Sequence, residues 1–385
     1  MRRLGMVVIL VLLGTLLLVV PVAWADGPQD PPKLSLREAV ERAWKANDAI
    51  RAAGAAVDKA YQQRKDAADV VSRMFIPAPG PEQDPYVDVA WTGLLKADAS
   101  WRMAEKDLAN KKESVALEVY QKYFAVLSAQ AAVYKAEAAL ARDRWALQVA
   151  RAVYWSGSGT KTQLAAAEAK VAGAEKGLAA AREAFDKAYV AFNRLVGLQL
   201  QERPVLVDEP VTVPLVVYSL DAEAERAVES SVDIFKLERA RDMAQWDLDY
   251  PWTLDTYGRP VYRTYNVQKY EVEIADYNLA AAREALKERV RSTYHDLRAL
   301  EEQEAALEAA VRTAQDALRM VKAQYKVGLV AREKVREAEA TLAEAQASLY
   351  SIKCQRAALL ATWRYLTGRP VIESLQKFTP TSHVG

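Results

Sequence analysis

The chain has 385 residues, and its 52 lysines and arginines nearly balance its 51 aspartates and glutamates. No excess of positive charge marks a nucleic-acid surface, so the composition predicts no nucleic-acid partner. A single cysteine, Cys354, excludes an internal disulfide framework, and packing must therefore supply the stability.

The N-terminus has the pattern of a secretory signal, which we expect to be cleaved after Ala25. Arg2 and Arg3 precede an apolar run over residues 4–20, and Ala23 and Ala25 provide the small residues of a cleavage site. The alternative is an uncleaved membrane anchor, although the run is short for a span that needs ~20 apolar residues. No cysteine follows the cleavage site, which argues against a lipid anchor, and no later run predicts a transmembrane helix.

After the signal, Ser35 and Leu36 open a short helix, which leads into an irregular stretch rich in proline and aromatic residues. A long helix then runs from about Ala99 to Tyr154. Its apolar row repeats every seven positions and consists of Val119, Val126, Val133, Leu140, Leu147 and Tyr154. At ~1.5 Å per residue this helix is roughly 80 Å long, which is far more than a compact domain uses.

Gly157 and Gly159 follow this helix, and glycine allows a helix to stop and the chain to reverse. A second long helix runs from Leu164 to Leu195, where apolar residues alternate at steps of three and four as in a coiled coil. This seam consists of Leu164, Ala167, Val171, Ala174, Leu178, Ala181, Phe185, Ala188, Phe192 and Leu195. Large residues alternate with alanines, which lets the helix axes approach closely. The sequence therefore predicts a long antiparallel helical hairpin.

The second half of the chain repeats the first. Residues 154–157, Tyr-Trp-Ser-Gly, return as residues 325–328, Tyr-Lys-Val-Gly, at an offset of 171 positions. The seven-residue row returns with Glu304 as its one polar member, and the seam returns with Arg356 as a break. A second hairpin with its turn at Gly328 is therefore predicted.

The opening helix returns at Ser219 with a larger offset of 184, so the first half holds 13 more residues between its opening helix and its hairpin. This difference falls in the two irregular stretches rich in proline and aromatic residues. Between the halves, Pro204, Pro210 and Pro214 mark a joining segment that could hold a short strand.

These boundaries predict five segments. They are a signal peptide over residues 1–25, a first repeat over 26–203, a linker over 204–217, a second repeat over 218–370 and a C-terminal tail over 371–385. The predicted fold is mainly α, elongated and internally duplicated, with at most a few short strands at the end rich in proline and aromatic residues.

The residues that could carry catalysis or hold a cofactor do not form a site. Residues 157–162 look like a phosphate loop, but Thr160 stands where a Walker loop needs its lysine, and a long helix precedes instead of a strand. His295, His383 and Cys354 provide neither a metal-ligand spacing nor a nucleophile with its base. Glutamates on long helices most often form solvated faces. We therefore predict no enzyme activity, no bound metal and no cofactor.

Four features carry a resemblance to a known family. They are the Ser-Leu-x-x-Ala opening at residues 35–39, the tip sequence at residues 325–331 followed by Val335 and Ala338, the closing Leu-x-Gly at residues 195–197 and 366–368, and the duplication itself. Together they resemble the TolC-type outer-membrane efflux proteins over nearly the whole mature chain.

The resemblance implies a homotrimer whose helices form a tunnel through the periplasm, with a periplasmic adaptor protein and an inner-membrane transporter as partners. It also implies an outer-membrane and periplasmic location, or the extracytoplasmic cell surface where no outer membrane is present. The positions that it places at the hairpin tips, facing the adaptor or forming the turn, are Tyr154, Gly157, Gly159, Tyr325, Val327, Gly328 and Leu329. Lys334 and Glu337 match the positions of a possible tunnel constriction.

Two departures from the family pattern are visible. The Thr-Asp pair that is common after the tip is replaced by Thr162-Gln163 and by Glu333-Lys334, which puts cation-binding gate chemistry in doubt. Each half also offers only one strand-like segment, residues 86–92 and 261–268, whereas a spanning hairpin needs two strands of ~9–11 residues. We therefore expect a shortened or missing β-barrel.

Aromatic residues gather in the irregular stretches, at the end opposite the glycine turns. Such side chains can contact a membrane interface or can plug the open end of a helical bundle. The candidates for membrane contact are Tyr86, Trp91, Trp252, Tyr257 and Tyr262. The leading hypothesis is the exit duct of a tripartite efflux or type I secretion system. The alternative is an exported coiled-coil scaffold or adaptor that has lost the membrane pore.

Overall fold

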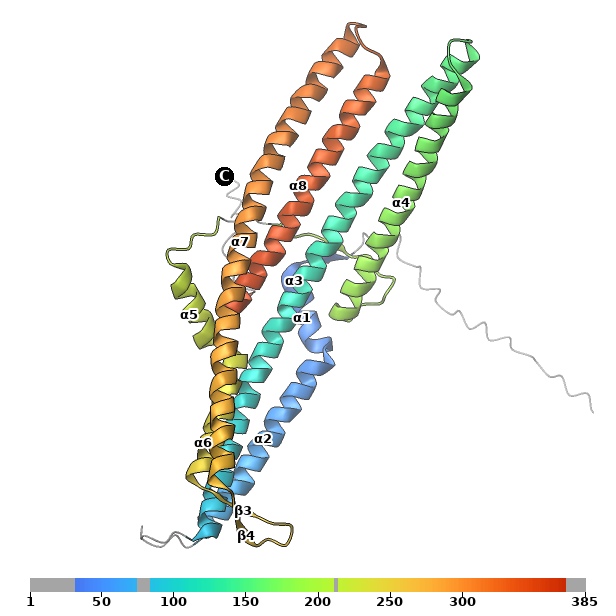
Figure 1. Ribbon diagram of the computed structural model, residues 1–385. Coiled ribbons are helices and arrows are strands. Elements are labelled where there is room, and N and C mark those ends of the chain that lie inside the picture. The colour runs from blue at the N-terminus through green and yellow to red at the C-terminus, as the bar shows by residue number, and fades with distance from the viewer. Residues whose placement is uncertain (1–31, 75–83, 211–213, 372–385) are drawn as a thin grey trace, which may run out of the picture.

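The computed structural model describes residues 32–74, 84–210 and 214–371, which are mainly helical, as the sequence predicts (Figure 1). The helices are α1 (Leu36–Ala46), α2 (Asp48–Arg73), α3 (Pro85–Trp155), α4 (Lys161–Val196), α5 (Leu220–Ser230), α6 (Val232–Asp249), α7 (Tyr265–Lys326) and α8 (Arg332–Leu366). The strands are β1 (Lys33–Leu34), β2 (Val205–Leu206), β3 (Trp252–Leu254) and β4 (Pro260–Tyr262). The predicted signal peptide lies outside the described residues.

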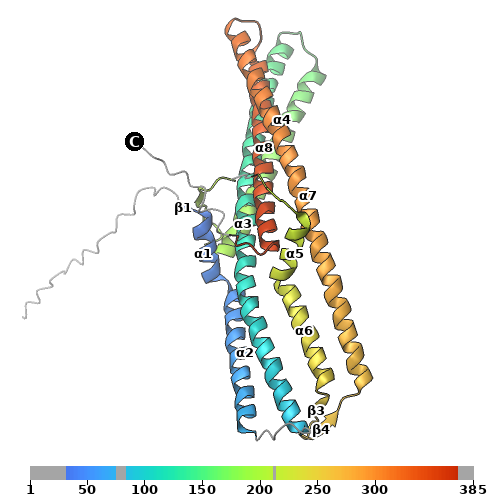
Figure 2. The same cartoon turned by 90° about the vertical axis from the view of Figure 1, so that its left-hand side faces the viewer.

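Two antiparallel hairpins, α3 with α4 and α7 with α8, lie side by side in an elongated molecule and point their tips to the same end (Figure 1). In the half of the molecule that carries the tips, the helices follow the order α7, α8, α3, α4. In the other half, α2 packs against α3, and α6 packs against both α3 and α7 (Figure 2). The two predicted hairpins are thus confirmed, and α3 and α7 are shared by both halves of the molecule.

The predicted seam of α4 is the face that packs against α3. Over residues 161–188 every side chain outside that seam is exposed. The members of the seam in this interval are Leu164, Ala167, Val171, Ala174, Leu178, Ala181, Phe185 and Ala188, and all of them are buried or half-buried. The three-and-four spacing therefore identified the packing face of this helix position by position.

The corresponding helix of the second half, α8, buries a wider surface because it lies between two helices. Ala357 and Ala361 belong to a core cluster with Phe124 of α3. Trp363 and Leu366 belong to a second cluster with residues of α7 such as Val290. The two hairpins are therefore joined through α8, whereas α4 lies at the edge.

The linker between the halves is fastened near the middle of the molecule. β2 pairs in parallel with β1, so the predicted short strand in the linker exists. The Tyr123 hydroxyl of α3 donates to the Leu34 carbonyl at 3.3 Å and accepts from the Asp208 N–H at 2.9 Å. Burial of Tyr123 raises the pKa of its phenol, so this hydroxyl remains a hydrogen-bond donor at physiological pH.

Residues 86–92, predicted as a strand, are helical instead. The Asp84 carboxylate accepts from the Tyr86 N–H at 2.9 Å and caps α3, and Pro85 occupies the first turn, where it needs no hydrogen-bond partner. As a result α3 begins 14 residues before the predicted start at Ala99.

Other predicted boundaries also shift. In each half the opening segment is two helices rather than one, separated by Asn47 and by Ser231, whose side chains cap the second helix of each pair. The second strand-like segment, residues 261–268, holds only the end of β4 before α7 begins. The predicted C-terminal tail begins with Val371, which is buried and donates its N–H to Glu113 at 3.2 Å, and residues 372–385 lie outside the described part of the chain.

The repeated Leu-x-Gly motif ends α4 and α8 against the opening helices. Gly197 and Gly368 have positive φ, 74° and 67°, and the following N–H groups bond back to Asn193 and Arg364. A Cβ added at Gly197 would lie 2.6 Å from the Cβ of Ala46, and one at Gly368 would clash with Ser230. Glycine is therefore needed twice over, for its backbone angle and for the close approach.

We expect Gly197→Ala to lower the free energy of unfolding by about 1–3 kcal/mol, because alanine is strained in the left-handed conformation and its Cβ would also clash with Ala46. Urea denaturation followed by circular dichroism measures this change. Gly93→Ala is the matched control: Gly93 lies inside α3 with no atom within 4 Å of an added Cβ, so alanine there should stabilise by about 0.5–1 kcal/mol. Equal effects of the two substitutions would contradict this role for Gly197.

Candidate functional site at the hairpin tips

The first tip is a tight helix stop followed at once by a new helix. Gly157 has φ 76° and donates its N–H to the Tyr154 carbonyl at 3.0 Å, and Ser158 donates to Val153 at 3.1 Å. These two bonds form a Schellman motif, which satisfies the last carbonyls of α3. The Thr160 side chain then caps α4 together with Gln163. This cap explains why the sequence departs from a phosphate loop at Thr160.

Gly159 serves the first tip in a different way from Gly157. It does not have a positive φ, but an added Cβ would lie 3.1 Å from Val153 and Tyr154. Glycine at this position therefore provides room for the chain to fold back over the end of α3.

The second tip uses the same stop. Gly328 has φ 78° and donates to Tyr325 at 3.0 Å, and Leu329 donates to Gln324 at 2.9 Å. The following helix, α8, begins at Arg332, and its N-cap residue Ala331 provides no side-chain cap. The sequence offset of 171 thus corresponds to the same backbone geometry at both tips, as expected from the repeat.

Both tips carry large apolar side chains in contact with solvent. The exposed fraction is 78% for Trp155, 70% for Val327 and 75% for Leu329, and Tyr154 and Tyr325 are also exposed. Trp155 was not among the tip residues that we selected from the sequence, although its position between Tyr154 and the turn indicates that it belongs to the tip. Exposed apolar residues gathered at one end are typical of a surface that binds another protein.

The two candidate constriction residues contact each other on the first turns of α8. Lys334 Nζ lies 2.8 Å from Glu337 Oε2, and both side chains are exposed. This bond raises the pKa of Lys334 and lowers the pKa of Glu337, which Arg142 of α3 lowers further. The pair is therefore charged at physiological pH and lies near a residue of the neighbouring hairpin.

Polar contacts between α3 and α8 join the two hairpins and were not predicted from the sequence. Lys135 lies 2.7 Å from Glu344, and the hydroxyls of Ser128 and Ser351 lie 2.9 Å apart. Closer to the tips, the Arg332 guanidinium lies 5.1 Å from the centre of the Trp145 ring. No local pattern reveals these contacts, because they join residues about 190 or more positions apart.

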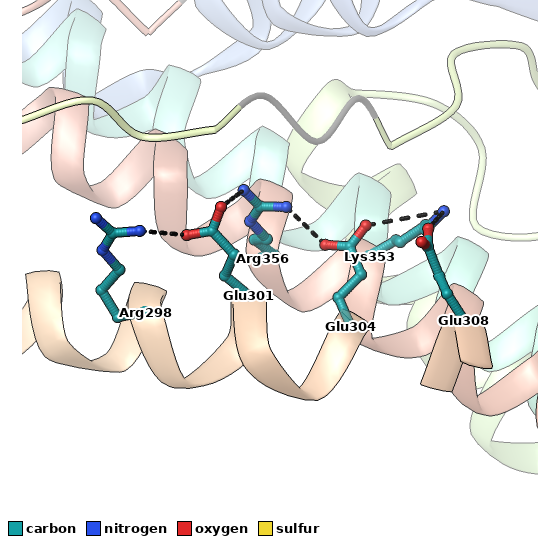
Figure 3. A network of polar contacts seen from close by, with 6 residues as sticks. All are labelled: Arg298, Glu301, Glu304, Glu308, Lys353 and Arg356. Carbon is teal, nitrogen blue, oxygen red and sulfur yellow. Dashed lines mark hydrogen bonds and ion pairs between the residues drawn. The ribbon is translucent and has the colours of Figure 1, made fainter. Parts of the chain in front are cut away.

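The two polar residues that interrupt the apolar rows of the second half are each other's partner (Figure 3). Arg356 of α8 lies 2.7 Å from Glu304 of α7, and only 9% of each side chain is exposed. Arg356 also lies 3.3 Å from Glu301, and Lys353 lies 3.0 Å from Glu308 (Figure 3). Of these ion pairs, Arg356 with Glu304 is the buried one.

The first hairpin shows what this buried pair replaces. At the offset of 171, Glu304 corresponds to Val133 and Arg356 corresponds to Phe185, so the first hairpin has two half-buried apolar residues at the positions of the ion pair. The half-buried pair Lys353–Glu308 has a direct equivalent in Arg182–Glu137, at 2.9 Å. A buried ion pair adds little net stability but strongly penalises the loss of one partner.

We expect Arg356→Phe to lower the free energy of unfolding by about 3–5 kcal/mol, because Glu304 then stays buried opposite an apolar ring. The double variant Glu304→Val/Arg356→Phe copies the first hairpin and should recover most of that loss. Chemical denaturation of both variants tests this. A single variant as stable as the unmodified protein would show that the pair is not effectively buried.

The aromatic residues that we proposed for membrane contact lie at the end opposite the tips, where β3 and β4 turn (Figure 1). Trp252 is half-buried and packs edge-on against Tyr262, with ring centres 5.4 Å apart. Tyr257 is exposed in the turn, and Tyr86 and Trp91 are exposed on the first turns of α3. The structure thus brings all five to one end, four of them open to solvent.

A further exposed apolar row on α7 was missed. Val267, Tyr270, Ile274 and Tyr277 are exposed at steps of three and four, on the opposite side from the buried row that includes Val272 and Leu279. The spacing in the sequence was the available signal.

The described residues were searched for groups that could hold a metal and for a reactive thiol. They include no group of three or more histidine, cysteine, aspartate or glutamate side chains that could hold a metal. Cys354 is buried, which raises the pKa of its thiol to about 12, so it is a packing residue and not a nucleophile. None of the helices in this part of the chain combines the length and the hydropathy needed to cross a membrane.

Comparison with known proteins extends the resemblance. A family model described as outer membrane efflux protein matches residues 213–369, and one described as TP096X N-terminal domain matches residues 91–213. No curated protein matches the sequence.

Solved structures share the fold across most of the chain. For the outer-membrane channel OprN the TM-score is 0.65 at 16% identity, covering 87% of this chain and 90% of that chain. For the outer membrane protein VceC of Vibrio cholerae the TM-score is 0.65 at 14% identity, and the match covers 87% of this chain and 96% of that chain. For the Campylobacter jejuni CmeC outer membrane channel the TM-score is 0.66 at 13% identity, and the match covers 86% of this chain and 85% of that chain. At these identities the likeness is one of fold.

Proposed function

We propose that this chain, a member of the outer membrane efflux protein family, forms the passive exit duct of a tripartite efflux or type I secretion system. In this proposal it is exported to the cell envelope, assembles as a homotrimer, and works with a periplasmic adaptor and an inner-membrane transporter. The observation that supports the proposal best is the two-ended shape: both hairpin tips lie at one end and exposed aromatic residues lie at the other (Figure 1).

The tips are the proposed docking end. Each is held by a glycine stop that fixes the backbone, and each presents exposed apolar side chains, including Trp155 on the first and Leu329 on the second. A rigid turn loses little conformational entropy on binding, and buried apolar area supplies the affinity. Lys334 and Glu337, one turn beyond the second tip, are proposed to line the constriction of the duct.

A second candidate function is an exported coiled-coil scaffold or adaptor. The observation that favours it is the length of β3 and β4, which have three residues each, whereas a strand that crosses a membrane needs ~9–11 residues. The scaffold and the duct share the hairpins and the docking tips, so they differ in whether the assembled protein conducts ions.

We expect the purified protein to produce discrete conductance steps in planar lipid bilayers, because a duct provides a continuous aqueous path. The variant Lys334→Glu/Glu337→Lys keeps the total charge and should change the ratio of cation to anion permeability if the pair lines the constriction. A trimer that never conducts would favour the scaffold. Unchanged selectivity in a conducting pore would remove the pair from the constriction.

We expect a photo-crosslinking amino acid at Val327 to capture an envelope protein in the source cell, because the Val327 side chain is exposed at the second tip. Mass spectrometry of the crosslinked band identifies that protein as an adaptor or another class. Tyr218 is the matched control, because it is 99% exposed but lies just before α5, away from the tips. The same product from both positions would argue against docking at the tips.

A further inference from the structure

The end of the first repeat is fastened to its beginning. After α4 the chain turns back over Asn193, whose side-chain amide donates to the carbonyls of Gln199 and Glu202 at 3.0 and 2.8 Å. The chain then forms β2, which pairs in parallel with β1, just before α1. The strand pair therefore ties α1 to the segment that follows α4.

The segment that opens the second repeat has no such partner. At the offset of 184, β1 corresponds to residues 217–218, just before α5. Tyr218 is 99% exposed and Val216 is 70% exposed. Within the described residues, no hydrogen bond joins the backbone of residues 214–218 to another backbone group. An exposed apolar segment with free backbone groups is a surface onto which a strand can add.

The tyrosine that holds the closure of the first repeat is present in the second repeat too. Tyr123 bonds to both sides of that closure, and its ring packs against Phe192 with ring centres 5.9 Å apart. At the offset of 171 these residues correspond to Tyr294 and Trp363, whose ring centres are 6.0 Å apart. Leu215 and the neighbouring residue 217 pack against the cluster that contains Trp363. The clamp of the first repeat is thus duplicated beside the unpartnered segment.

Two polar groups near this second clamp lack acceptors. The indole N–H of Trp363 is buried and has no hydrogen-bond partner among the described residues. Arg364 stands at the position of Asn193 and is half-buried, but within this part of the chain its guanidinium forms no ion pair or hydrogen bond. Because donors withdrawn from water need acceptors, a segment with free carbonyls is expected to cover this place.

We propose that the C-terminal tail covers this surface, with residues 376–378 paired in parallel with residues 216–218 in the way that β2 is paired with β1. The occupant is therefore a segment of the same chain. The proposal goes beyond the proposed function and does not depend on whether the protein conducts ions.

The starting point and the length of the tail fit this placement. Val371 is buried and donates its N–H to Glu113 at 3.2 Å, so the tail leaves from a fixed point beyond the end of α8. In the first repeat residues 197–204 connect α4 to β2, and the equivalent connection in the second repeat is residues 368–375. The tail is long enough to repeat this path, with residues 379–385 left over.

The ladder of the first repeat sets the expected register. The N–H groups of Val205 and Val207 donate to the carbonyls of Pro32 and Leu34, at 3.0 and 3.4 Å. Leu34 itself faces Leu206.

In the second repeat the corresponding donors are the N–H groups of Gln376 and Phe378, and the corresponding acceptors are the carbonyls of Val216 and Tyr218. Lys377 is then the residue that faces Tyr218. This pairing satisfies the free carbonyls of the exposed segment and covers its apolar side chains.

The pairing would tie α5 to the end of α8, as the first strand pair ties α1 to the end of α4. The opening helices α1 and α5 lie at the same level of the molecule (Figure 2). Both ends of the segment that joins the repeats would therefore be fastened at that level, the first by Tyr123 and the second by Tyr294.

The test is disulfide formation in the full chain carrying Tyr218→Cys and Lys377→Cys. Facing residues of neighbouring strands lie ~4.8 Å apart, a separation that a disulfide spans. Mild oxidation should join the two positions within one chain, and mass spectrometry of the digested protein detects the joined peptides. Cys354 stays in place because it is buried.

The matched control is Tyr218→Cys with Ser382→Cys, which moves the second cysteine about 16 Å further along an extended chain and should give at least tenfold less product. Equal yields from the two pairs would show a tail without a fixed register and would overturn the proposal. A disulfide that forms only between two chains would overturn pairing within the chain.

Hydrogen exchange gives a second readout that does not depend on cysteines. Residues 376–378 should be protected in the unmodified protein, and Tyr294→Phe, which removes only the hydroxyl, should speed their exchange about three- to tenfold. Tyr123→Phe is the control, because it should speed exchange at residues 205–208 and leave the tail unchanged. An unprotected tail, or an equal effect of both variants on it, overturns the proposal and leaves the duct proposal standing.

Discussion

The close antiparallel packing of long helices along rows of alternating large and small side chains is the interaction on which the rest of the structure depends. In α4 this row is Leu178, Phe185 and their neighbours, separated by alanines, and it is the side of the helix that is withdrawn from water. Because each step of three or four residues adds one buried contact, the hairpin gains stability in proportion to its length. Because these contacts repeat along the helices, the molecule is long and thin, with its tips far from its middle.

Glycine determines where each hairpin turns and closes. Gly157 and Gly328 stop the helices at the tips, and Gly197 and Gly368 end the returning helices against the opening helices of each repeat. These positions need a backbone conformation that other residues adopt only with strain. The two halves therefore keep the same turns even though their surface residues differ.

The two hairpins differ most in their interiors. The buried pair of Glu304 with Arg356 stands where the first hairpin has Val133 and Phe185. Replacing either residue by an apolar side chain would take the nearest opposite charge from a buried ion, which is costly. The pair thus fixes α7 and α8 to each other in one alignment, while α8 also carries the contact with α3 that joins the hairpins.

Sequence alone determined the hairpins, their turns and the packing face of α4, because helix periodicity and glycine are local properties that a single chain displays in order. It located the turns at Gly157 and Gly328, which have positive φ in the structure. It misread residues 86–92 as a strand, because a run of aromatic and β-branched residues outweighed the cap formed by Asp84 and Pro85.

Only the tertiary structure decided which helices are neighbours. It showed that Glu304 and Arg356, the polar residues that interrupt two separate apolar rows, form an ion pair. It also showed that α8 contacts helices of both hairpins, and that α4 and α7 lie at the edges. Such pairings join residues tens to hundreds of positions apart. No local pattern encodes them, and they are set by the packing of whole helices against one another.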